Sequence, residues 1–313
     1  MKKEKREKGK GKSYCFKVEA GCHFAQIGKM ALLFYLLSFT FYLFSCSSAP
    51  KNPGDIFDLR KRAETQLGLG NKQSDRGSLD SAMLLLDDAL QLAIAADDPS
   101  LRIRVKLSRG NVLFSLGRAD EARENWDAAL AEAELAGNRE LAAICRIHIG
   151  RGKLLSPNAR ETAQAVRDEV SKDITLIKSG SFYTAFAWTV IGIAEKELGR
   201  YAEAESAVRR SLAINEKDRR LELAAYDWFM IGSFRSLSGN FRGAQQALET
   251  AITFDRRVEN SWGLASDWRA LGDVRIKAGE REAALAAYQR SAEILRAMGN
   301  ESAAAETLSR IDR

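Results

Sequence analysis

The sequence predicts an all-α protein built from about six stacked helical hairpins. Glycines recur at a spacing near 40 residues, and residues that favour helices are abundant while β-branched runs are scarce. Only four of the 313 residues are proline, so long stretches are free to be helical. A repeat of this length indicates one supersecondary unit, which buries its apolar face only by stacking on its neighbours.

Two series of glycines set the period. The first series is spaced 40, 40, 42, 40 and 40 residues apart and consists of Gly70, Gly110, Gly150, Gly192, Gly232 and Gly272. The second series follows it by seven residues and consists of Gly77, Gly117, Gly199, Gly239 and Gly279. The third unit has Ser156 and Pro157 near that place. We expect the first glycine to allow close approach of a neighbouring helix, and the second to supply the positive φ that ends a helix.

Other side chains keep the same register. Twelve residues after the first glycine stand Ala82, Ala122, Ala204, Ala244 and Ala284, where the two helices of a hairpin should cross. Four residues after these alanines stand Leu86, Trp126, Val208, Leu248 and Tyr288. Tryptophans recur 40 residues apart, four residues before a first-series glycine, as Trp188, Trp228 and Trp268. We interpret these tryptophans as packing residues rather than as a ligand cage.

The clearest copies of the unit read WTVIGIAEKELGRYAEAESAV, WFMIGSFRSLSGNFRGAQQAL and WRALGDVRIKAGEREAALAAY. They resemble the tetratricopeptide repeat, and the resemblance covers residues from about 60 to 300. It implies a tetratricopeptide-like α-solenoid, here an array over residues 57–300, with helices longer than those of the standard 34-residue repeat. Residues 301–313 look like a terminal helix that caps the stack. Proteins of this kind bind other proteins, so the resemblance implies no enzyme activity and no cofactor.

The N-terminal 45 residues have the layout of a signal peptide, with a basic region over residues 1–29 and an uncharged apolar region over residues 30–45. The end of this segment, Leu43-Phe44-Ser45-Cys46, resembles the lipobox of bacterial lipoprotein signals. The resemblance implies cleavage before Cys46, lipidation of its thiol and a lipidated linker over residues 46–56. Ser47 after the cysteine implies sorting to the outer membrane. The alternative is an uncleaved N-terminal transmembrane anchor, and both interpretations place the array outside the cytoplasm.

The net charge of +6 resides in the predicted leader. Residues 1–29 hold nine basic and three acidic side chains, a surplus of six that equals the charge of the whole chain. The remaining residues therefore contain equal numbers of bases and acids. A nucleic-acid-binding surface needs a surplus of positive charge, so we expect no nucleic-acid partner.

The candidate binding residues follow from the resemblance, because the first helix of each tetratricopeptide unit lines a concave groove. The groove positions lie three and six residues before, one after and four after the first glycine. They include Asn71, Arg104, Asn111, Phe114, Arg151, Phe186, Tyr226, Phe229 and Arg269. Asparagines at such places grip a peptide backbone in related arrays, and aromatic and arginine side chains are the usual anchors of interfaces.

The remaining reactive side chains predict no chemistry. His148 is the only histidine beyond the leader and lacks partners for a metal site, so we interpret it as structural. Cys145 lies in an apolar helical stretch, where a buried and inert thiol is expected. We therefore expect no catalytic residue and no metal site.

These observations predict a membrane-anchored adaptor or scaffold in the bacterial cell envelope. Three alternatives stay open. One is a solute-binding accessory subunit of an envelope transporter, which would hold a small hydrophobic molecule in an apolar pore. Another is a surface adhesin. The third is an enzyme, which would require a cluster of polar residues with perturbed acidity in the groove, and the sequence shows none.

Overall fold

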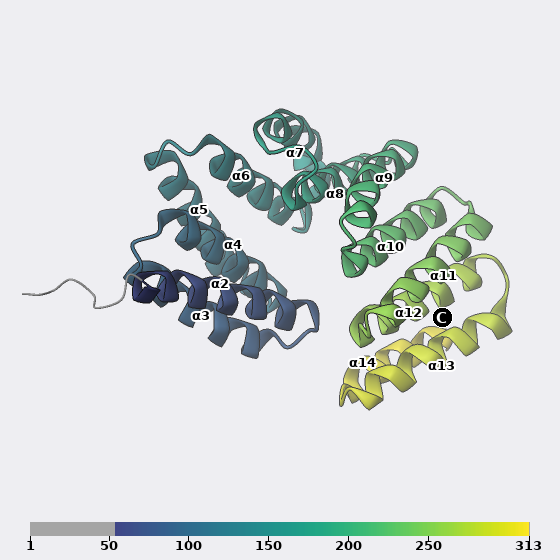
Figure 1. The fold of residues 1–313 in the computed structure, drawn as a ribbon. Coiled ribbons are helices and arrows are strands. Elements are labelled where there is room, and N and C mark those ends of the chain that lie inside the picture. The colour runs from purple at the N-terminus through teal and green to yellow at the C-terminus, as the bar shows by residue number, and fades with distance from the viewer. Residues whose placement is uncertain (1–53, 313) are drawn as a thin grey trace, which may run out of the picture. The chain divides into compact units, whose positions relative to one another are not determined.

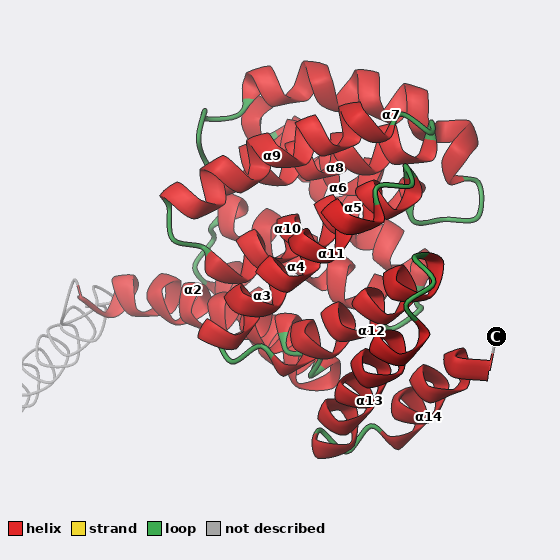
Figure 2. Ribbon diagram, turned by 90° about the vertical axis from the view of Figure 1, so that its right-hand side faces the viewer, coloured by secondary structure: helices red, strands yellow, loops and turns green. Residues whose placement is uncertain are grey.

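The computed structural model describes residues 54–312, and the chain divides into two units, Met1–Asp55 and Ile56–Arg313. The predicted signal peptide, lipobox and most of the linker lie outside the described residues. Residues 54–312 form thirteen α-helices and two short 3-10 helices joined by short loops, without a strand (Figure 2). The predicted all-α class is therefore confirmed. No helix in this range has both the length and the apolar character needed to cross a bilayer.

Consecutive helices pair into six hairpins (Figure 1). They are α2 (Gly54–Asp75) with α3 (Leu79–Ala95), α4 (Pro99–Ser115) with α5 (Ala119–Leu135), α6 (Arg139–Leu154) with α7 (Ala159–Asp173), α8 (Phe182–Glu197) with α9 (Tyr201–Lys217), α10 (Leu221–Leu237) with α11 (Phe241–Arg257), and α12 (Ser261–Lys277) with α13 (Arg281–Ala297). The short 3-10 helix η1 (Ile174–Leu176) follows α7. Each hairpin packs mainly on the one before it and the one after it, as a solenoid requires.

The end of the array is a single helix rather than a seventh hairpin. Helix α14 (Glu301–Leu308) packs on α13 and continues into the 3-10 helix η2 (Ser309–Asp312). Its buried residues are Ala304 and Thr307, so only one side of the helix is covered. This is the predicted C-terminal cap, because it covers the last hairpin with a helix whose other side is exposed.

First-series glycines allow the two helices of a hairpin to touch. A Cβ placed on Gly110 would stand 2.2 Å from Nε1 of Trp126, and a Cβ on Gly272 would stand 2.6 Å from Cε1 of Tyr288. In both hairpins the obstructing side chain is the bulky residue sixteen positions later, which is the partner that the sequence register predicts. The alanine between them, Ala122 or Ala284, is fully buried.

Second-series glycines end the first helix of a hairpin. Gly117 and Gly239 have φ angles of +76° and +82°, a left-handed conformation that costs glycine little. The loops that join one hairpin to the next have the same left-handed conformation, but the residue is not always glycine. Arg219 and Glu259 in these loops both have φ of +56°. The glycine spacing therefore marks the turns inside hairpins better than the joins between them. The third unit, which lacks its second glycine, still forms a complete hairpin, with Pro157 in its turn.

The recurring tryptophans lie against the outside of the core. Trp188, Trp228 and Trp268 are half-buried and pack on core clusters, and none of them lines the main cavity described below. An arginine lies over each ring, the nearest being Arg210, whose Cζ is 4.4 Å from the centroid of Trp188. This arrangement supports the packing interpretation, because the ring faces are occupied by the protein's own side chains.

Candidate functional site

The first helices of the six hairpins line a central cavity of about 980 Å³. Its wall combines polar, basic and aromatic side chains from α2, α4, α6, α8, α10 and α12, and a few side chains from α9 and α11 also reach it. The turn after α2 lies close to α12, because a Cβ on Gly77 would stand 3.7 Å from the indole of Trp262. The first and sixth hairpins therefore meet beside the cavity.

Eight of the nine candidate residues lie on this cavity. They are Asn71, Arg104, Asn111, Arg151, Phe186, Tyr226, Phe229 and Arg269. For six of them the shared location follows from helix geometry, since positions six before and one after a glycine differ from it by roughly 100–120° around the helix, at about 100° per residue, while Phe229 and Arg269, three before a glycine, differ by about 60° in the same direction. The glycine faces its partner helix, so these side chains face the cavity. Their role as binding residues stays a prediction.

Phe114 lies elsewhere, so its expected place in the groove is wrong. Its ring centroid is 5.9 Å from that of Trp126, and it lines a second hollow of about 480 Å³ beside α5 and α6. The position four after Gly110 is only about 40° from the glycine around the helix, so its side chain points toward the partner helix.

Aromatic side chains form two stacked pairs on the wall. The ring centroids of Tyr226 and Phe229 are 6.3 Å apart, and those of Phe182 and Phe186 are 6.4 Å apart. The guanidinium of Arg220 lies over Phe182, with its Cζ 5.8 Å from the ring centroid. Flat apolar faces edged by guanidinium groups can hold both the apolar and the acidic side chains of a ligand.

His148 has a structural role on this wall, as the sequence predicted. Its Nδ1 is 3.1 Å from Oδ1 of Asn111, and its ring centroid is 4.5 Å from that of Phe186. Burial lowers the pKa of His148 to about 3, so its ring is uncharged at neutral pH. The histidine fixes two of the candidate binding side chains in place. Cys145 on the same helix is fully buried, and burial raises the pKa of its thiol to about 12, which keeps it protonated and inert.

Sequence reasoning missed a set of buried carboxyl groups on the cavity. Asp227, Asp255 and Asp267 line the cavity and are only 1%, 3% and 2% exposed. Burial raises the pKa of Asp227 to about 7, that of Asp255 to about 6 and that of Asp267 to about 9. No cluster with perturbed acidity was found in the sequence, and the structure places one on the cavity wall. Asp227 and Asp267 directly precede two of the recurring tryptophans and are therefore 40 residues apart. This spacing was the signal in the sequence that could have identified them.

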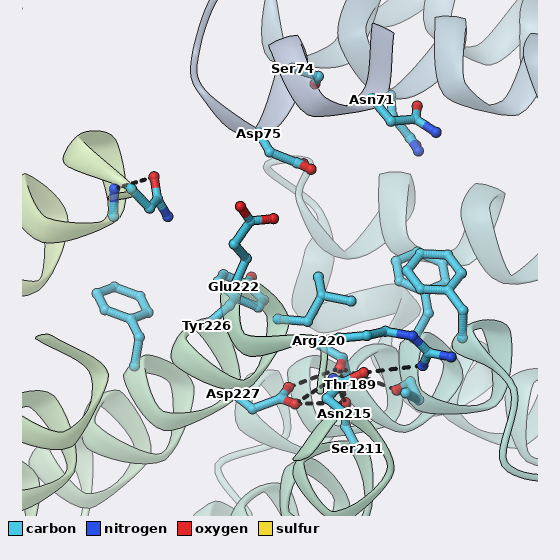
Figure 3. A pocket seen from close by; sticks show the side chains of 18 of the residues that line it. Asn71, Ser74, Asp75, Thr189, Ser211, Asn215, Arg220, Glu222, Tyr226 and Asp227 are labelled. Atoms are coloured by element: carbon cyan, nitrogen blue, oxygen red, sulfur yellow. Dashed lines mark hydrogen bonds between the residues drawn. The ribbon is translucent and has the colours of Figure 1, made fainter. Parts of the chain in front are cut away.

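Asp227 is held by three donors (Figure 3). Its Oδ2 accepts hydrogen bonds from Asn215 Nδ2 at 2.8 Å and from Ser211 Oγ at 3.0 Å, and its Oδ1 accepts one from Thr189 Oγ1 at 3.4 Å. These donors come from α8 and α9, so the carboxyl group joins two hairpins. Its hydrogen-bonding capacity is well used by the protein itself, which indicates a structural role.

The described residues on the cavity wall form no Ser–His–Asp triad. Among the residues that the structure describes on this wall, the one histidine is bonded to an asparagine and not to a hydroxyl group. In residues 54–312 no three His, Cys, Asp or Glu side chains gather in a way that could hold a metal ion. The cavity instead offers hydrogen-bonding groups, charges of both signs and aromatic faces along its length.

Comparison with known proteins supports the fold. Residues 187–218, which cover α8 and α9 in large part, match the tetratricopeptide repeat family. No curated protein matches the chain in sequence. A crystal structure of a Rap protein complexed with competence and sporulation factor is similar with a TM-score of 0.56 at 15% identity, covering 80% of this chain and 75% of that one.

Other similar structures have different biological settings. The apo form of RapI matches with a TM-score of 0.56 at 14% identity, covering 88% of this chain and 96% of that one. PilW, described as a widely conserved type IV pilus biogenesis factor, matches with a TM-score of 0.50 at 17% identity, covering 80% of this chain and 98% of that one. At these identities the likeness shows the fold alone, and it confirms a tetratricopeptide-like α-solenoid.

Proposed function

We propose that this tetratricopeptide-like solenoid is an adaptor that binds a peptide, or an extended segment of a partner protein, in the central cavity. The observation that carries the proposal is the wall itself, to which six successive first helices contribute asparagine, arginine and aromatic side chains. An extended backbone carries a donor and an acceptor at nearly every residue, and these groups need polar partners when they leave water. Aromatic and arginine side chains supply the anchoring energy.

The similar structures support this use of the fold. One of them is a Rap protein complexed with competence and sporulation factor, and another is the Cut9–Hcn1 hetero-tetramer, with a TM-score of 0.55. In both cases an array of this kind is seen with a bound partner. A small hydrophobic solute is a poorer fit to this cavity, because arginine and aspartate side chains from several helices lie on its wall.

The site of action belongs to the same proposal. We place the array in the bacterial cell envelope, held to a membrane by a lipid on Cys46, on the strength of the lipobox-like sequence and the basic and apolar segments before it. The similar fold of a pilus biogenesis factor is compatible with an envelope setting. An uncleaved transmembrane anchor is the alternative.

Crosslinking from inside living cells tests the adaptor function. With the photoreactive residue benzoylphenylalanine at Tyr226, which lies on the cavity and is 43% exposed, we expect a discrete crosslinked species after irradiation. The matched control is the same residue at Leu84, which is 73% exposed on α3 and does not line the cavity. Mass spectrometry of the crosslinked band would identify the partner segment. Equal crosslinking at the two positions, or crosslinking at Leu84 alone, would refute the cavity as the binding site.

Metabolic labelling tests the anchor. Cells that express the full chain and receive radioactive palmitate should show a labelled band of the expected size, and the Cys46→Ala variant should show none. The reason is that a lipoprotein signal attaches its lipid to that one thiol. The control is Cys145→Ala, which removes a buried thiol and should leave labelling unchanged. Equal labelling of the wild type and Cys46→Ala would refute lipidation at Cys46, and the absence of label from both would favour the uncleaved anchor.

A further inference from the structure

The fifth and sixth hairpins repeat one buried aspartate but not its partners. Asp267 stands 40 residues after Asp227 and is buried to the same degree. The three donors that hold Asp227 have counterparts 40 residues later, and these are Ala251, Asp255 and Phe229 in place of Ser211, Asn215 and Thr189. None of the three replacement side chains is a hydrogen-bond donor when Asp255 is ionised. The substitution thus leaves the second aspartate without the support that the first one has.

The contacts of the second site agree with this comparison. Asp255 Oδ1 accepts a hydrogen bond from Asn260 Nδ2 at 3.0 Å, whereas Asp267 Oδ2 has no hydrogen-bond partner within the described part of the chain. It is the only carboxylate oxygen among the buried, unpartnered side-chain atoms of that part. Burial, the like charge of Asp255 and a side-chain hydrogen bond to Asp255 together raise the pKa of Asp267 to about 9, so Asp267 keeps its proton at neutral pH and shares it with Asp255. A buried carboxyl pair that is satisfied by one shared proton can exchange that proton for a cationic group that reaches it through the cavity.

Space for the pair is provided by a glycine. Asp255 Oδ2 lies 2.0 Å from the place that a Cβ on Gly263 would take, so any other residue there would displace this carboxylate. Gly263 lies in the first turn of α12, where Asn260 caps the helix by accepting a hydrogen bond from its N–H at 3.1 Å. The first turn of α12 can therefore approach the carboxylate of Asp255 closely.

Two further acidic side chains act on this region of the cavity, whose wall also carries arginines. Glu222 of α10 repels the carboxylates of both Asp255 and Asp75, the latter at the end of α2. Figure 3 shows Asp75 and Glu222 extending into the cavity from opposite sides. Four carboxyl groups from four different helices therefore share one region of the cavity. Like charges gathered in this way favour a cationic ligand.

We infer that the segment bound in the cavity presents an ammonium or guanidinium group to the paired carboxyl groups of Asp255 and Asp267. This inference rests on the proposed function, because it specifies the chemistry of the segment that the adaptor binds. Such a cation supplies the hydrogen-bond donors that Ser211 and Asn215 supply to Asp227, and its charge neutralises the acidic region. A metal ion fits less well, since no third ligand of the usual kinds joins the pair in the described residues.

A peptide selection with the full chain in detergent micelles tests the inference. A library of random nine-residue peptides displayed on phage is selected on the wild type, and the binding of the best peptide is measured by fluorescence anisotropy. We expect that peptide to contain a lysine, an arginine or a required free amino terminus. Replacing the basic residue with glutamine, or acetylating the amino terminus, should weaken binding at least about tenfold. Whichever change weakens binding identifies the source of the cation.

Two protein variants complete the test. Asp255→Asn recreates the Asn215–Asp227 arrangement that the fifth hairpin already contains, so the variant should fold, and Asp267→Asn removes the unpartnered carboxylate. Each should weaken the cationic peptide at least about tenfold and leave the glutamine-substituted peptide unchanged. The control is Asp80→Asn, which removes one negative charge from an exposed site on α3 and should change neither affinity.

The possible failures are distinguishable. The inference is wrong if Tyr226→Ala abolishes peptide binding but the peptides need no cationic group. It is also wrong if Asp255→Asn and Asp267→Asn bind the peptides as tightly as the wild type does. In both cases the proposed function stands. If no peptide is selected whose binding depends on Tyr226, both are wrong. A thermal melt of each variant shows that it is folded before its affinity is interpreted.

Discussion

Replacing Gly110 with alanine should destabilise the protein by about 3 kcal/mol, near the upper end for an overpacked core. The new methyl group would meet the indole of Trp126, whose Nε1 lies 2.2 Å from the position of the added Cβ. Two further contacts restrain the indole. Its opposite edge faces Gly152, where an added Cβ would stand 2.5 Å from Cζ3, and its Nε1 donates a hydrogen bond to the carbonyl oxygen of Leu107 at 3.3 Å.

The matched control for this substitution is Gly68→Ala. Gly68 also lies inside a helix, but it is exposed and a Cβ there would meet nothing within 4 Å. That variant should gain about 0.5–1 kcal/mol, because alanine has the higher helix propensity. Urea unfolding followed by circular dichroism measures both changes. A loss at Gly68, or no loss at Gly110, would contradict the distinction between packing and propensity.

A second substitution shows whether the cause is the indole. In a Trp126→Leu background, Gly110→Ala should cost less than it does in the wild type, because leucine can change rotamer to make room for the methyl group. Other hairpins already combine a first-series glycine with a smaller partner, for example Gly232 with Leu248. An unchanged cost in the leucine background would point to the backbone rather than to Trp126.

Asp267→Asn should stabilise the protein at alkaline pH by at least about 2 kcal/mol, the lower bound being the usual cost of burying an unpartnered polar group. The wild type should lose stability as the pH rises. An unfolded aspartate has a pKa near 3.8, whereas burial raises the pKa of Asp267 in the folded state to about 9. Between these values the folded state binds the proton more tightly, so its stability is complete below about pH 4 and falls by up to about 1.4 kcal/mol per pH unit above that.

Two other aspartates also make the free energy of unfolding fall as the pH rises, each over a narrower range of pH. The pKa values of Asp255 and Asp227 are raised to about 6 and about 7, so their contributions end near those pH values. Above about pH 7 the slope should therefore belong mostly to Asp267, and Asp267→Asn should flatten it. Asp227→Asn should gain less, because Ser211 and Asn215 already stabilise the charge of that carboxylate.

The measurement is urea unfolding at several pH values between about 5 and 9, compared for the wild type and Asp267→Asn. The control variant Asp80→Asn, with an exposed carboxylate, should follow the wild type. A wild-type stability that is flat above pH 7, or a variant as steep as the wild type, would show that Asp267 is ionised and satisfied in the free protein. The proposed cation site would then lose its main support, since the free carboxylate would need no ligand.

The sequence by itself determined the repeat architecture. The register of Gly110, Ala122 and Trp126 gives the contact between two helices of one hairpin, and the same register recurs in the other units. A solenoid hairpin touches mainly its neighbours, so most contacts are local in sequence and the spacing of small and bulky residues specifies them. The same locality explains why eight of nine candidate residues lie on one cavity, as helical periodicity alone orients them.

Only the tertiary structure decided what the cavity wall contains. The hydrogen bond between His148 and Asn111 joins residues 37 positions apart, and Gly77 contacts Trp262 although four hairpins lie between them in the sequence. Asp227 and Asp267 occupy equivalent places in sequence, yet one is satisfied and the other is not, because their partners come from adjacent helices. Small rotations between successive hairpins accumulate along a solenoid. The accumulated rotation decides which distant side chains share a buried space, and no local sequence pattern encodes it.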